Sequence, residues 1–428
     1  MTARTPQPTR SYPHSDTHPH ADVATSLAQD RGEVRALTGM RLFAAAWVVL
    51  FHFEFTHGHL LARALAPAFP VVTTGAMGVD LFFVLSGFVI AYTYLDKLGP
   101  ALRVRATGRF YWARVCRIWP VYALVTTLFL GFLLFKRWYW AVASPAYQSV
   151  QPTLDPLSWL RQLTLTQMWS RPWHDGASFV GPAWSVSAEM CAYALFPLAA
   201  RLFYRLRRAP RWLLGVAAVL VMAPEATLLL VTGSPYFAYS WLLRILAGFT
   251  AGALVYLVVR EIPRTPRVRR IAAVASWIMI ALIVAGLLIG DWLGPVQPLN
   301  STERGGMVLV LFPPLIGALS LGSGWLDRLL SSRIAVHGGR ISYSLYLVHV
   351  PVFEAFWTAQ ERVGFLQHDS LASVVLTPVV FVLVFVLADL LYRWVEEPAR
   401  RALRPRRRPS ETYPAESRSA ESRSAESR

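Results

Sequence analysis

The sequence predicts an all-α membrane protein, a polytopic bundle of about ten transmembrane helices. The first reason is composition, because the 428-residue chain is 54% hydrophobic and only 16% charged, too apolar for ordinary soluble domains. The second is that its apolar residues fall in runs of about 20, the length that crosses a bilayer as a helix. The third is that the basic residues, which give a net charge of +17, lie between these runs rather than on one polar domain. This placement argues against nucleic-acid binding.

The apolar runs give the predicted spans in order. Spans are predicted near residues 37–57, 75–95, 111–135, 183–204, 212–232, 236–259, 271–290, 306–322, 341–360 and 372–395. Pro224 and Glu225 interrupt the fifth run. Pro313 and Pro314 interrupt the eighth. Proline removes a helix hydrogen bond and clashes with the preceding turn, so the continuity of these two spans is open.

The basic residues between the spans predict the orientation. The short connections 232–235, 290–305 and 361–370 contain Arg304 and Arg362 and no other Lys or Arg, whereas the connections between them are rich in arginine. Cytoplasmic loops carry the excess of Lys and Arg. The alternation therefore predicts an even number of spans in a multi-pass protein of the cell membrane, with both termini in the cytoplasm.

The segments outside the spans complete the predicted organisation. Residues 1–33 are predicted to be a disordered arm, residues 34–403 the membrane domain, and residues 404–428 a disordered basic and repetitive tail, so no second globular domain is expected. Residues 136–181 form a long outer loop rich in Trp, which either folds over the outer mouth or anchors at the membrane interface. Cys116 and Cys191 lie within or beside apolar runs, so no disulfide framework and no metal site are expected.

Ionisable residues inside the predicted spans are the candidate functional residues. A charged side chain in the bilayer costs a few kcal/mol, so it marks either a functional path or a link between helices. The residues are His52, Glu54, Asp80, Arg114, Arg117, Glu189, Arg244, His349 and Asp389.

His52 is the candidate catalytic base. Ten mostly apolar residues separate it from Arg41. In a helix this spacing corresponds to roughly 16 Å, or half of the hydrocarbon core. Imidazole titrates near neutrality and can take the proton of a hydroxyl group. Asp80 or Glu189 would orient the ring, as the carboxylate does in hydrolase triads, although a salt link between helices is the structural alternative.

Three arginines are candidates for binding an anion. Arg114 and Arg117 are three residues apart and share a helix face, which suits a bidentate grip on the phosphates of a nucleotide-bearing donor. Anchoring at the cytoplasmic surface is the alternative for this pair. Arg244 lies midway along its span, where anchoring does not explain it, so it requires a partner or an anion.

Motifs in a fixed order identify a resemblance. They are the Arg41…His52 pair, GAMGVDLFFVLSGFVIAY, FYWARVCRIWPVY, GPAWSVSAEMCAY, GGRISYSLYLVHVPV and RWVEEPARR. On these motifs the chain, from about residue 34 to 403, resembles the acyltransferase-3 family of integral-membrane O-acyltransferases. The resemblance implies transfer of an acyl group from cytosolic acyl-CoA to a hydroxyl of a sugar or another acceptor.

The resemblance also implies roles for individual residues. His52 is the catalytic histidine, Arg41 its motif partner, and Arg114 and Arg117 contact the donor phosphates. It implies supporting roles for Asp80, Glu189 and His349. Taking both arguments together, we assign Asp80 and Glu189 to the catalytic group with His52, and Arg244 and His349 to substrate binding with the other three arginines. No bound cofactor is expected beyond acyl-CoA as co-substrate, and direct transfer and a covalent acyl-enzyme both stay open.

The expected acceptor is a glycosylated small molecule or macrolide-type secondary metabolite, because the chain resembles the stand-alone members of the family. O-acetylation of a cell-surface polysaccharide is the alternative within the family. A proton-coupled secondary transporter is the alternative from another class, although such transporters are often built from internal repeats and none is visible here. The expected partners are acyl-CoA, the hydroxylated acceptor and membrane lipid, with no nucleic acid.

Overall fold

The computed structural model describes residues 26–29, 32–54, 69–140, 150–295, 303–322, 324–367 and 370–403. Throughout these ranges the regular elements are helices and no strand occurs, which confirms the predicted all-α fold class. The predicted tail at 404–428 and most of the predicted arm at 1–33 lie outside the described residues.

Helices that are long and apolar enough to cross a membrane number nine in the described ranges. They are Arg35–Phe53, Gly75–Leu98, Val104–Trp140, Gly181–Leu206, Arg211–Thr232, Ser240–Val259, Pro266–Trp292, Glu303–Leu321 and Leu371–Ala402. Each overlaps one of the predicted spans. The remaining predicted span, 341–360, lies inside α14 (Arg333–Arg362), which has 30 residues but carries many polar side chains. The chain is a multi-pass membrane protein.

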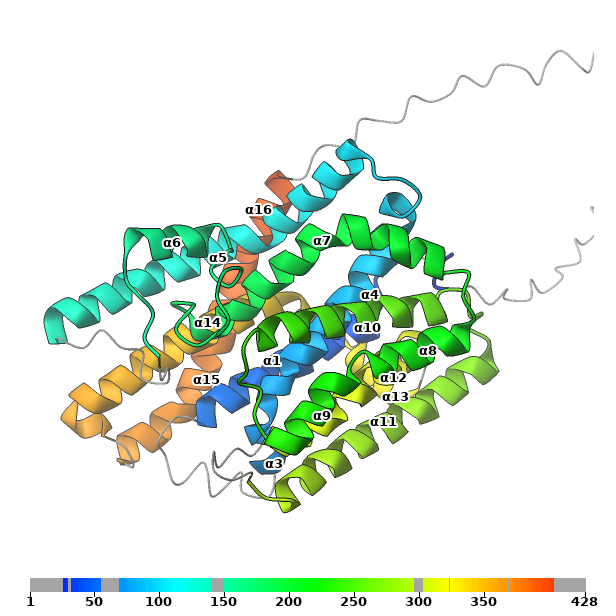
Figure 1. Ribbon diagram of the computed structural model, residues 1–428. Coiled ribbons are helices and arrows are strands. Elements are labelled where there is room, and N and C mark those ends of the chain that lie inside the picture. The colour runs from blue at the N-terminus through cyan, green and yellow to red at the C-terminus, as the bar shows by residue number, and fades with distance from the viewer. Residues whose placement is uncertain are drawn as a thin grey trace, which may run out of the picture.

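Four helices form the centre of the bundle (Figure 1). They are α1 (Arg35–Glu54), α4 (Gly78–Leu98), α10 (Ser240–Val259) and α14, and the main pairs are α4 with α10 and α1 with α14. Glycine permits both contacts: a Cβ atom at Gly252 would lie 2.0 Å from the Val84 carbonyl oxygen, and one at Gly339 would lie 1.8 Å from that of Thr38. Small residues let membrane helices approach this closely.

Proline determines where two of the spans are broken, as the sequence suggested. The span from Arg211 to Thr232 consists of α8 (Arg211–Leu220) and α9 (Ala223–Thr232), and Pro224 lies in the first turn of α9. The span from Glu303 to Leu321 begins as a 3-10 helix, η4 (Glu303–Leu311), and continues as α12 (Phe312–Leu321), with Pro313 in its first turn. Proline is tolerated there because the first N–H groups of a helix have no intrahelical partner.

The predicted outer loop at 136–181 is partly helical. Its first residues belong to α5 (Val104–Trp140), which has 37 residues and extends beyond the predicted span at both ends. Helix α6 (Pro156–Leu163) lies beside α5 (Figure 1). The short helix η3 (Gly181–Ala183) then leads into α7 (Trp184–Leu206). Residues 141–149 of this loop lie outside the described ranges.

The remaining helices surround the centre on both sides (Figure 1). Helix α11 (Pro266–Trp292) lies on the side of α8, α9 and α12, and α15 (Leu371–Leu391) lies beside α14. The shorter elements are α3 (Phe69–Thr73), η2 (Gly75–Met77), α13 (Trp325–Leu330), η5 (Gly364–Leu366), η6 (Tyr392–Glu396) and α16 (Glu397–Ala402).

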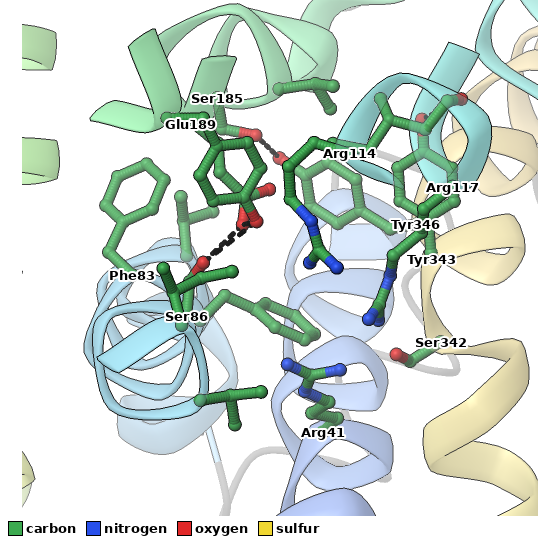
Figure 2. A pocket seen from close by; sticks show the side chains of 17 residues that line it. Arg41, Phe83, Ser86, Arg114, Arg117, Ser185, Glu189, Ser342, Tyr343 and Tyr346 are labelled. Atoms are coloured by element: carbon green, nitrogen blue, oxygen red, sulfur yellow. Dashed lines mark hydrogen bonds between the residues drawn. The ribbon is translucent and has the colours of Figure 1, made fainter. Parts of the chain in front are cut away.

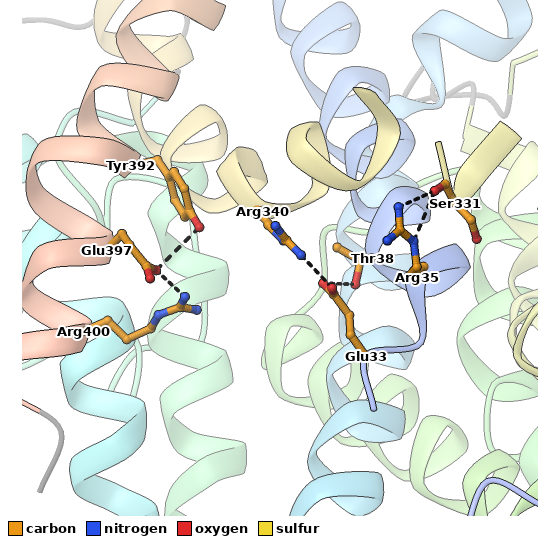
Figure 3. Close-up of polar contacts among 8 residues, drawn as sticks. All are labelled: Glu33, Arg35, Thr38, Ser331, Arg340, Tyr392, Glu397 and Arg400. Carbon is orange, nitrogen blue, oxygen red and sulfur yellow. Dashed lines mark hydrogen bonds and ion pairs between the residues drawn. The ribbon is translucent and has the colours of Figure 1, made fainter. Parts of the chain in front are cut away.

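Polar contacts fix the N-terminal end of α1, the helix that carries Arg41 and His52 (Figure 3). Arg35 donates a 2.9 Å hydrogen bond to the Ser331 carbonyl oxygen. Arg340 of α14 and Thr38 both donate to the Glu33 carboxylate, at 2.7 and 3.1 Å. Nearby in α16, Glu397 accepts from Arg400. Helix α1 is therefore held in register with α14 at this end.

Candidate active site

Two cavities lie among the central helices. The first, here called the arginine pocket, has about 750 Å³ of open space and is lined by residues that include Arg41, Arg114, Arg117 and Glu189. The second, here called the histidine pocket, has about 830 Å³ and is lined by residues that include His52, His174 and Arg244. The ten-residue gap between Arg41 and His52 thus separates two cavities along one helix.

The arginine pocket collects positive charge from two helices. Arg41 comes from α1, and Arg114 and Arg117 come from α5; their guanidinium groups point into one space (Figure 2). Arg114 donates a 3.2 Å hydrogen bond to the Tyr94 hydroxyl. Within the described ranges, Arg41 and Arg117 have no hydrogen-bond or ion-pair partner. Unpaired guanidinium groups at membrane depth are costly, so the pocket suits an anionic ligand.

Glu189 of α7 is the carboxylate of the arginine pocket. It accepts a 2.5 Å hydrogen bond from Ser86 (Figure 2). It also accepts one from the Tyr193 hydroxyl. The aromatic ring of Tyr193 also lies 5.8 Å from the Arg114 guanidinium. One carboxylate faces three guanidinium groups on the pocket wall, so the pocket keeps an excess of positive charge.

His52 lies in the histidine pocket with a defined tautomer. Its Nδ1–H donates to the Val48 carbonyl oxygen at 2.9 Å and lies 3.3 Å from Nε2 of His349. Because a carbonyl oxygen only accepts, the proton is on Nδ1 and the lone pair of the ring is on Nε2. His349 is held in the same way, since its Nδ1 lies 3.2 Å from the Leu345 carbonyl oxygen. Nε2 of His52 is therefore the atom that can accept a proton.

His349 lies behind His52. It is 0% exposed and is not among the residues that line the two pockets, so its assignment to substrate binding stays a prediction. Its ring packs against the His52 ring, with centroids 5.0 Å apart. The side of α14 that carries His349 faces α1, so His349 supports the His52 ring.

The carboxylate partners predicted for His52 are bonded elsewhere. Asp80 accepts from Arg244 Nε at 2.9 Å and from Arg244 Nη2 at 2.7 Å. Glu189 lies in the arginine pocket. Neither therefore orients the imidazole directly, because α4 turns Asp80 toward α10, where the buried guanidinium needs a counter-ion.

The partner that Arg244 requires is thus Asp80. A second carboxylate, Glu225, lies 3.4 Å from Arg244 Nε, and the Trp184 ring lies 5.0 Å from the guanidinium. Arg244 still lines the histidine pocket. The bidentate pair links α4 to α10 beside that pocket.

The outer loop contributes residues to the histidine pocket that sequence reasoning missed. His174 stacks on Tyr236, with ring centroids 5.0 Å apart and planes at 24°, and lies 4.9 Å from the Trp184 ring. Burial and the nearby charge of Arg244 lower the pKa of His174 to about 4, so this ring is neutral at pH 7. Glu303 also lines the pocket. The aromatic richness of segment 136–181 was the feature of the sequence that could have indicated this contribution to the pocket.

No group of three or more His, Cys, Asp or Glu that could hold a metal ion occurs in the parts of the chain that the structure describes.

Comparison with known proteins identifies the chain's relatives. The family model of the Acyltransferase domain (Acyl_transf_3) matches residues 34–393. The chain is 28% identical to Acyltransferase MdmB of Streptomyces mycarofaciens over 88% of its own length and 94% of that protein. It is 24% identical to the Putative peptidoglycan O-acetyltransferase YrhL of Bacillus subtilis, over 86% of this chain and 55% of that protein.

A third relative is the Peptidoglycan O-acetyltransferase OatA of Listeria monocytogenes, 23% identical over 87% of this chain and 56% of that protein. The chain therefore spans about half the length of the two peptidoglycan-related proteins. No solved structure matches the chain.

Proposed function

Because the chain belongs to the acyltransferase-3 family of membrane O-acyltransferases, we propose that it moves an acyl group from acyl-CoA to a hydroxyl group of a sugar or macrolide-type secondary metabolite. The observation that carries this proposal is the pair of pockets along α1. One pocket offers unpaired guanidinium groups for the phosphates of the donor, and the other offers an imidazole with a defined lone pair for the hydroxyl of the acceptor.

The arginine pocket is the proposed donor site. Arg41, Arg114 and Arg117 would hold the phosphates of CoA, since guanidinium groups bind phosphate oxygens in bidentate geometry. Along α1, Arg41 and His52 are roughly 16 Å apart, a span of the order of a pantetheine arm. A donor held by its phosphates at the arginines would place its thioester near the histidine pocket.

The histidine pocket is the proposed site of reaction. Nε2 of His52 accepts the proton of the acceptor hydroxyl as its oxygen attacks the thioester carbonyl carbon. The tetrahedral intermediate collapses, the C–S bond breaks, and the CoA thiolate leaves and takes from the imidazolium the proton that came from the acceptor hydroxyl. One ester bond forms and one thioester bond breaks, so direct transfer accounts for every bond and proton and requires no covalent acyl-enzyme.

The supporting residues act at a distance from the reacting atoms. His349 holds the His52 ring through the contact between Nδ1 and Nε2. The pair of Asp80 and Arg244 fixes α4 against α10 at the wall of the histidine pocket. Glu189, together with Ser86 and Tyr193, shapes the donor site.

The proposed orientation places both termini in the cytoplasm of a cell-membrane protein. The arginine-rich connections support it by the positive-inside rule. Acyl-CoA would then enter the arginine pocket from the cytoplasm. A small epitope tag at either terminus should be reached by antibody only after the cells are permeabilised; labelling of intact cells would reverse the orientation.

The acceptor is proposed to carry a ring, because the stacked pair of His174 and Tyr236 offers a flat aromatic face in the histidine pocket. A glycosylated small molecule or macrolide suits this face, and a cell-surface glycan is the second candidate that the O-acetyltransferase relatives favour.

One experiment tests donor and acceptor together. The purified protein in detergent is incubated with isotopically labelled acetyl-, propionyl- and butyryl-CoA and a panel of glycosylated macrolides and oligosaccharides, and products are analysed by mass spectrometry. We expect a product heavier by one acyl group, together with release of free CoA thiol. The absence of both transfer and acyl-CoA hydrolysis under conditions where the protein stays folded would contradict the enzymatic function and favour a transporter.

A further inference from the structure

Two side chains belong to the walls of both pockets and so lie at their boundary. Val79 of α4 and Tyr346 of α14 line both pockets, and among the described residues no other lining residue is shared. Both are nearly buried, each with 6% of its surface exposed. An acyl group bound through its CoA in the arginine pocket has to pass these two side chains before it reaches His52.

Tyr346 is held in place by polar contacts to η3 and α7. Its hydroxyl lies 2.8 Å from the carbonyl oxygen of Pro182 in η3. It also lies 2.7 Å from the hydroxyl of Ser185 in α7 (Figure 2). The Ser185 hydroxyl itself lies 3.0 Å from the same carbonyl oxygen. The two hydroxyl protons of Tyr346 and Ser185 are therefore shared among three short contacts. The edge of the ring packs against Phe82 of α4, with centroids 6.2 Å apart. The ring therefore has a fixed position across the boundary.

Residues along one face of α14 lead from one pocket to the other. Ser342 and Tyr343 line the arginine pocket, Tyr346 lines both pockets, and His349 contacts His52. Tyr346 lies four residues after Ser342, three after Tyr343 and three before His349, so each of these steps is about one helical turn, or 5.4 Å. Tyr346 thus lies midway between the proposed phosphate-binding residues and the proposed base.

We infer that Tyr346 and Val79 form a partition that determines which acyl groups are transferred. This inference rests on the proposed function and deepens it. The size of these two side chains sets the width of the passage between the donor site and the acceptor site. Acetyl and propionyl groups pass through it more readily than longer acyl chains. The partition also keeps water in the histidine pocket from reaching the CoA portion of the donor in the arginine pocket.

The test is the choice among competing acyl donors. Purified wild-type protein and variants are given equimolar acetyl-, butyryl- and hexanoyl-CoA with one acceptor, and the ratios of the ester products are measured. These ratios do not depend on the amount of folded protein. Tyr346→Ala is expected to raise the share of the hexanoyl ester at least tenfold. It is also expected to raise acyl-CoA hydrolysis relative to transfer.

Three further variants separate size from other effects. Val79→Phe narrows the passage and is expected to lower the share of the longer esters, a change opposite to that of Tyr346→Ala. Tyr346→Phe keeps the ring and is expected to keep the wild-type ratios within about threefold. Tyr111→Ala is the matched control, since the Tyr111 hydroxyl also donates to a backbone oxygen, that of Ala194, but its side chain lines neither pocket.

The possible outcomes are distinguishable. Wild-type ratios in both Tyr346→Ala and Val79→Phe would overturn the partition and leave the proposed function standing. If Tyr346→Ala does not fold, Val79→Phe alone decides, because an unchanged product ratio in that variant overturns the partition. A wild-type protein that transfers no acyl group from any CoA ester overturns the proposed function, and the partition with it.

Discussion

The arginine pocket and the histidine pocket both hold charged side chains, but they differ in how these charges are paired. In the histidine pocket, Arg244 is bonded to Asp80 through both carboxylate oxygens and lies near Glu225. In the arginine pocket, Arg41 and Arg117 have no such partner among the described residues. The two pockets nevertheless lie along the same four helices, α1, α4, α7 and α14.

This difference separates structural charges from charges that are available to a ligand. A buried ion pair that the protein completes itself holds helices together, and breaking it leaves an uncompensated charge. A buried guanidinium group without an internal partner is costly for the fold and becomes favourable when an anion arrives. The same logic makes the buried pair of Lys136 and Glu354, at 2.7 Å, a link between α5 and α14.

The largest effect should follow removal of the base in the histidine pocket. His52→Ala is expected to lower kcat of acyl transfer by about 100- to 10,000-fold, the usual contribution of a general base. KM for acyl-CoA should stay nearly unchanged, because the arginine pocket is intact. Steady-state kinetics with labelled acyl-CoA measures both constants.

His337→Ala is the control for His52→Ala. His337 is also a histidine of the bundle, but it pairs with Asp389 at 2.8 Å and lines neither pocket. It should keep wild-type kcat. Full activity of His52→Ala would exclude His52 as the base and contradict the assignment of donor binding and base catalysis to separate pockets.

The ion pair of the histidine pocket should affect stability. Arg244→Met leaves Asp80 and Glu225 buried without their cation, so we expect a loss of about 3–5 kcal/mol in the free energy of unfolding. Thermal unfolding in detergent measures the change. Arg211→Met is the control, because the Arg211–Glu261 pair is exposed at 53% and 55% and should contribute no more than about 1 kcal/mol.

A double variant sharpens this result. Asp80→Leu combined with Arg244→Met removes the bidentate pair as a whole and should recover part of the loss, because fewer buried charges are left unpaired. If the single variant is as stable as the Arg211→Met control, then Arg244 is not a structural cation, and the contrast between the pockets fails.

The arginine pocket should behave in the opposite way. Arg117→Ala is expected to raise KM for acyl-CoA by about 10- to 100-fold, the equivalent of one lost charge-assisted hydrogen bond. The midpoint of thermal unfolding should stay near that of the wild type, because Arg117 makes no hydrogen bond or salt bridge within the described residues and only its longer-range attraction to Glu396 is lost. Arg109→Ala, on the same helix and outside both pockets, is the control.

A large loss of stability in Arg117→Ala would show that the guanidinium serves the fold. An unchanged KM for acyl-CoA would instead show that it does not contact the donor. Either result contradicts the assignment of the arginine pocket to the donor phosphates.

The fold followed from the length of the apolar runs, and the exceptions have physical causes. Helix α14 is the predicted span that hydropathy marks least well, because its buried face carries polar residues such as Ser344, His349 and Glu354, all 0% exposed. These residues are bonded inside the bundle, so the helix is stable despite its composition. The predicted helix ends were less accurate, since α5 continues past the predicted end at residue 135 to Trp140.

Parts of the candidate site were predictable because they follow from local spacing. Arg41 and His52 lie on one helix, and Arg114 and Arg117 lie on one face of another, so each pair could be read from the sequence. The partner of Arg244 could not be read, since 164 residues separate it from Asp80. Tyr346 also gave no signal, because its place between two cavities depends on how α4, α7 and α14 pack.

The smallest expected effect concerns the neutral histidine of the histidine pocket. In the folded protein the pKa of His174 is about 4, below its ordinary value of 6.5, chiefly because the ring is buried and also because Arg244 is near. Between these two values the unfolded chain binds a proton at this position and the folded protein does not. Stability contributed by His174 is therefore complete above pH 6.5 and falls as the pH is lowered toward 4.

Thermal unfolding across this pH range measures the effect. The wild type should lose at most about 1.4 kcal/mol per pH unit through His174. His174→Phe keeps an aromatic ring against Tyr236 without a titrating group, so its stability should depend less steeply on pH between 4 and 6.5. His337→Phe, at a histidine outside both pockets, is the control. An identical slope in His174→Phe and the wild type would mean that His174 is charged in the folded protein, and the histidine pocket would then carry a second cation beside Arg244.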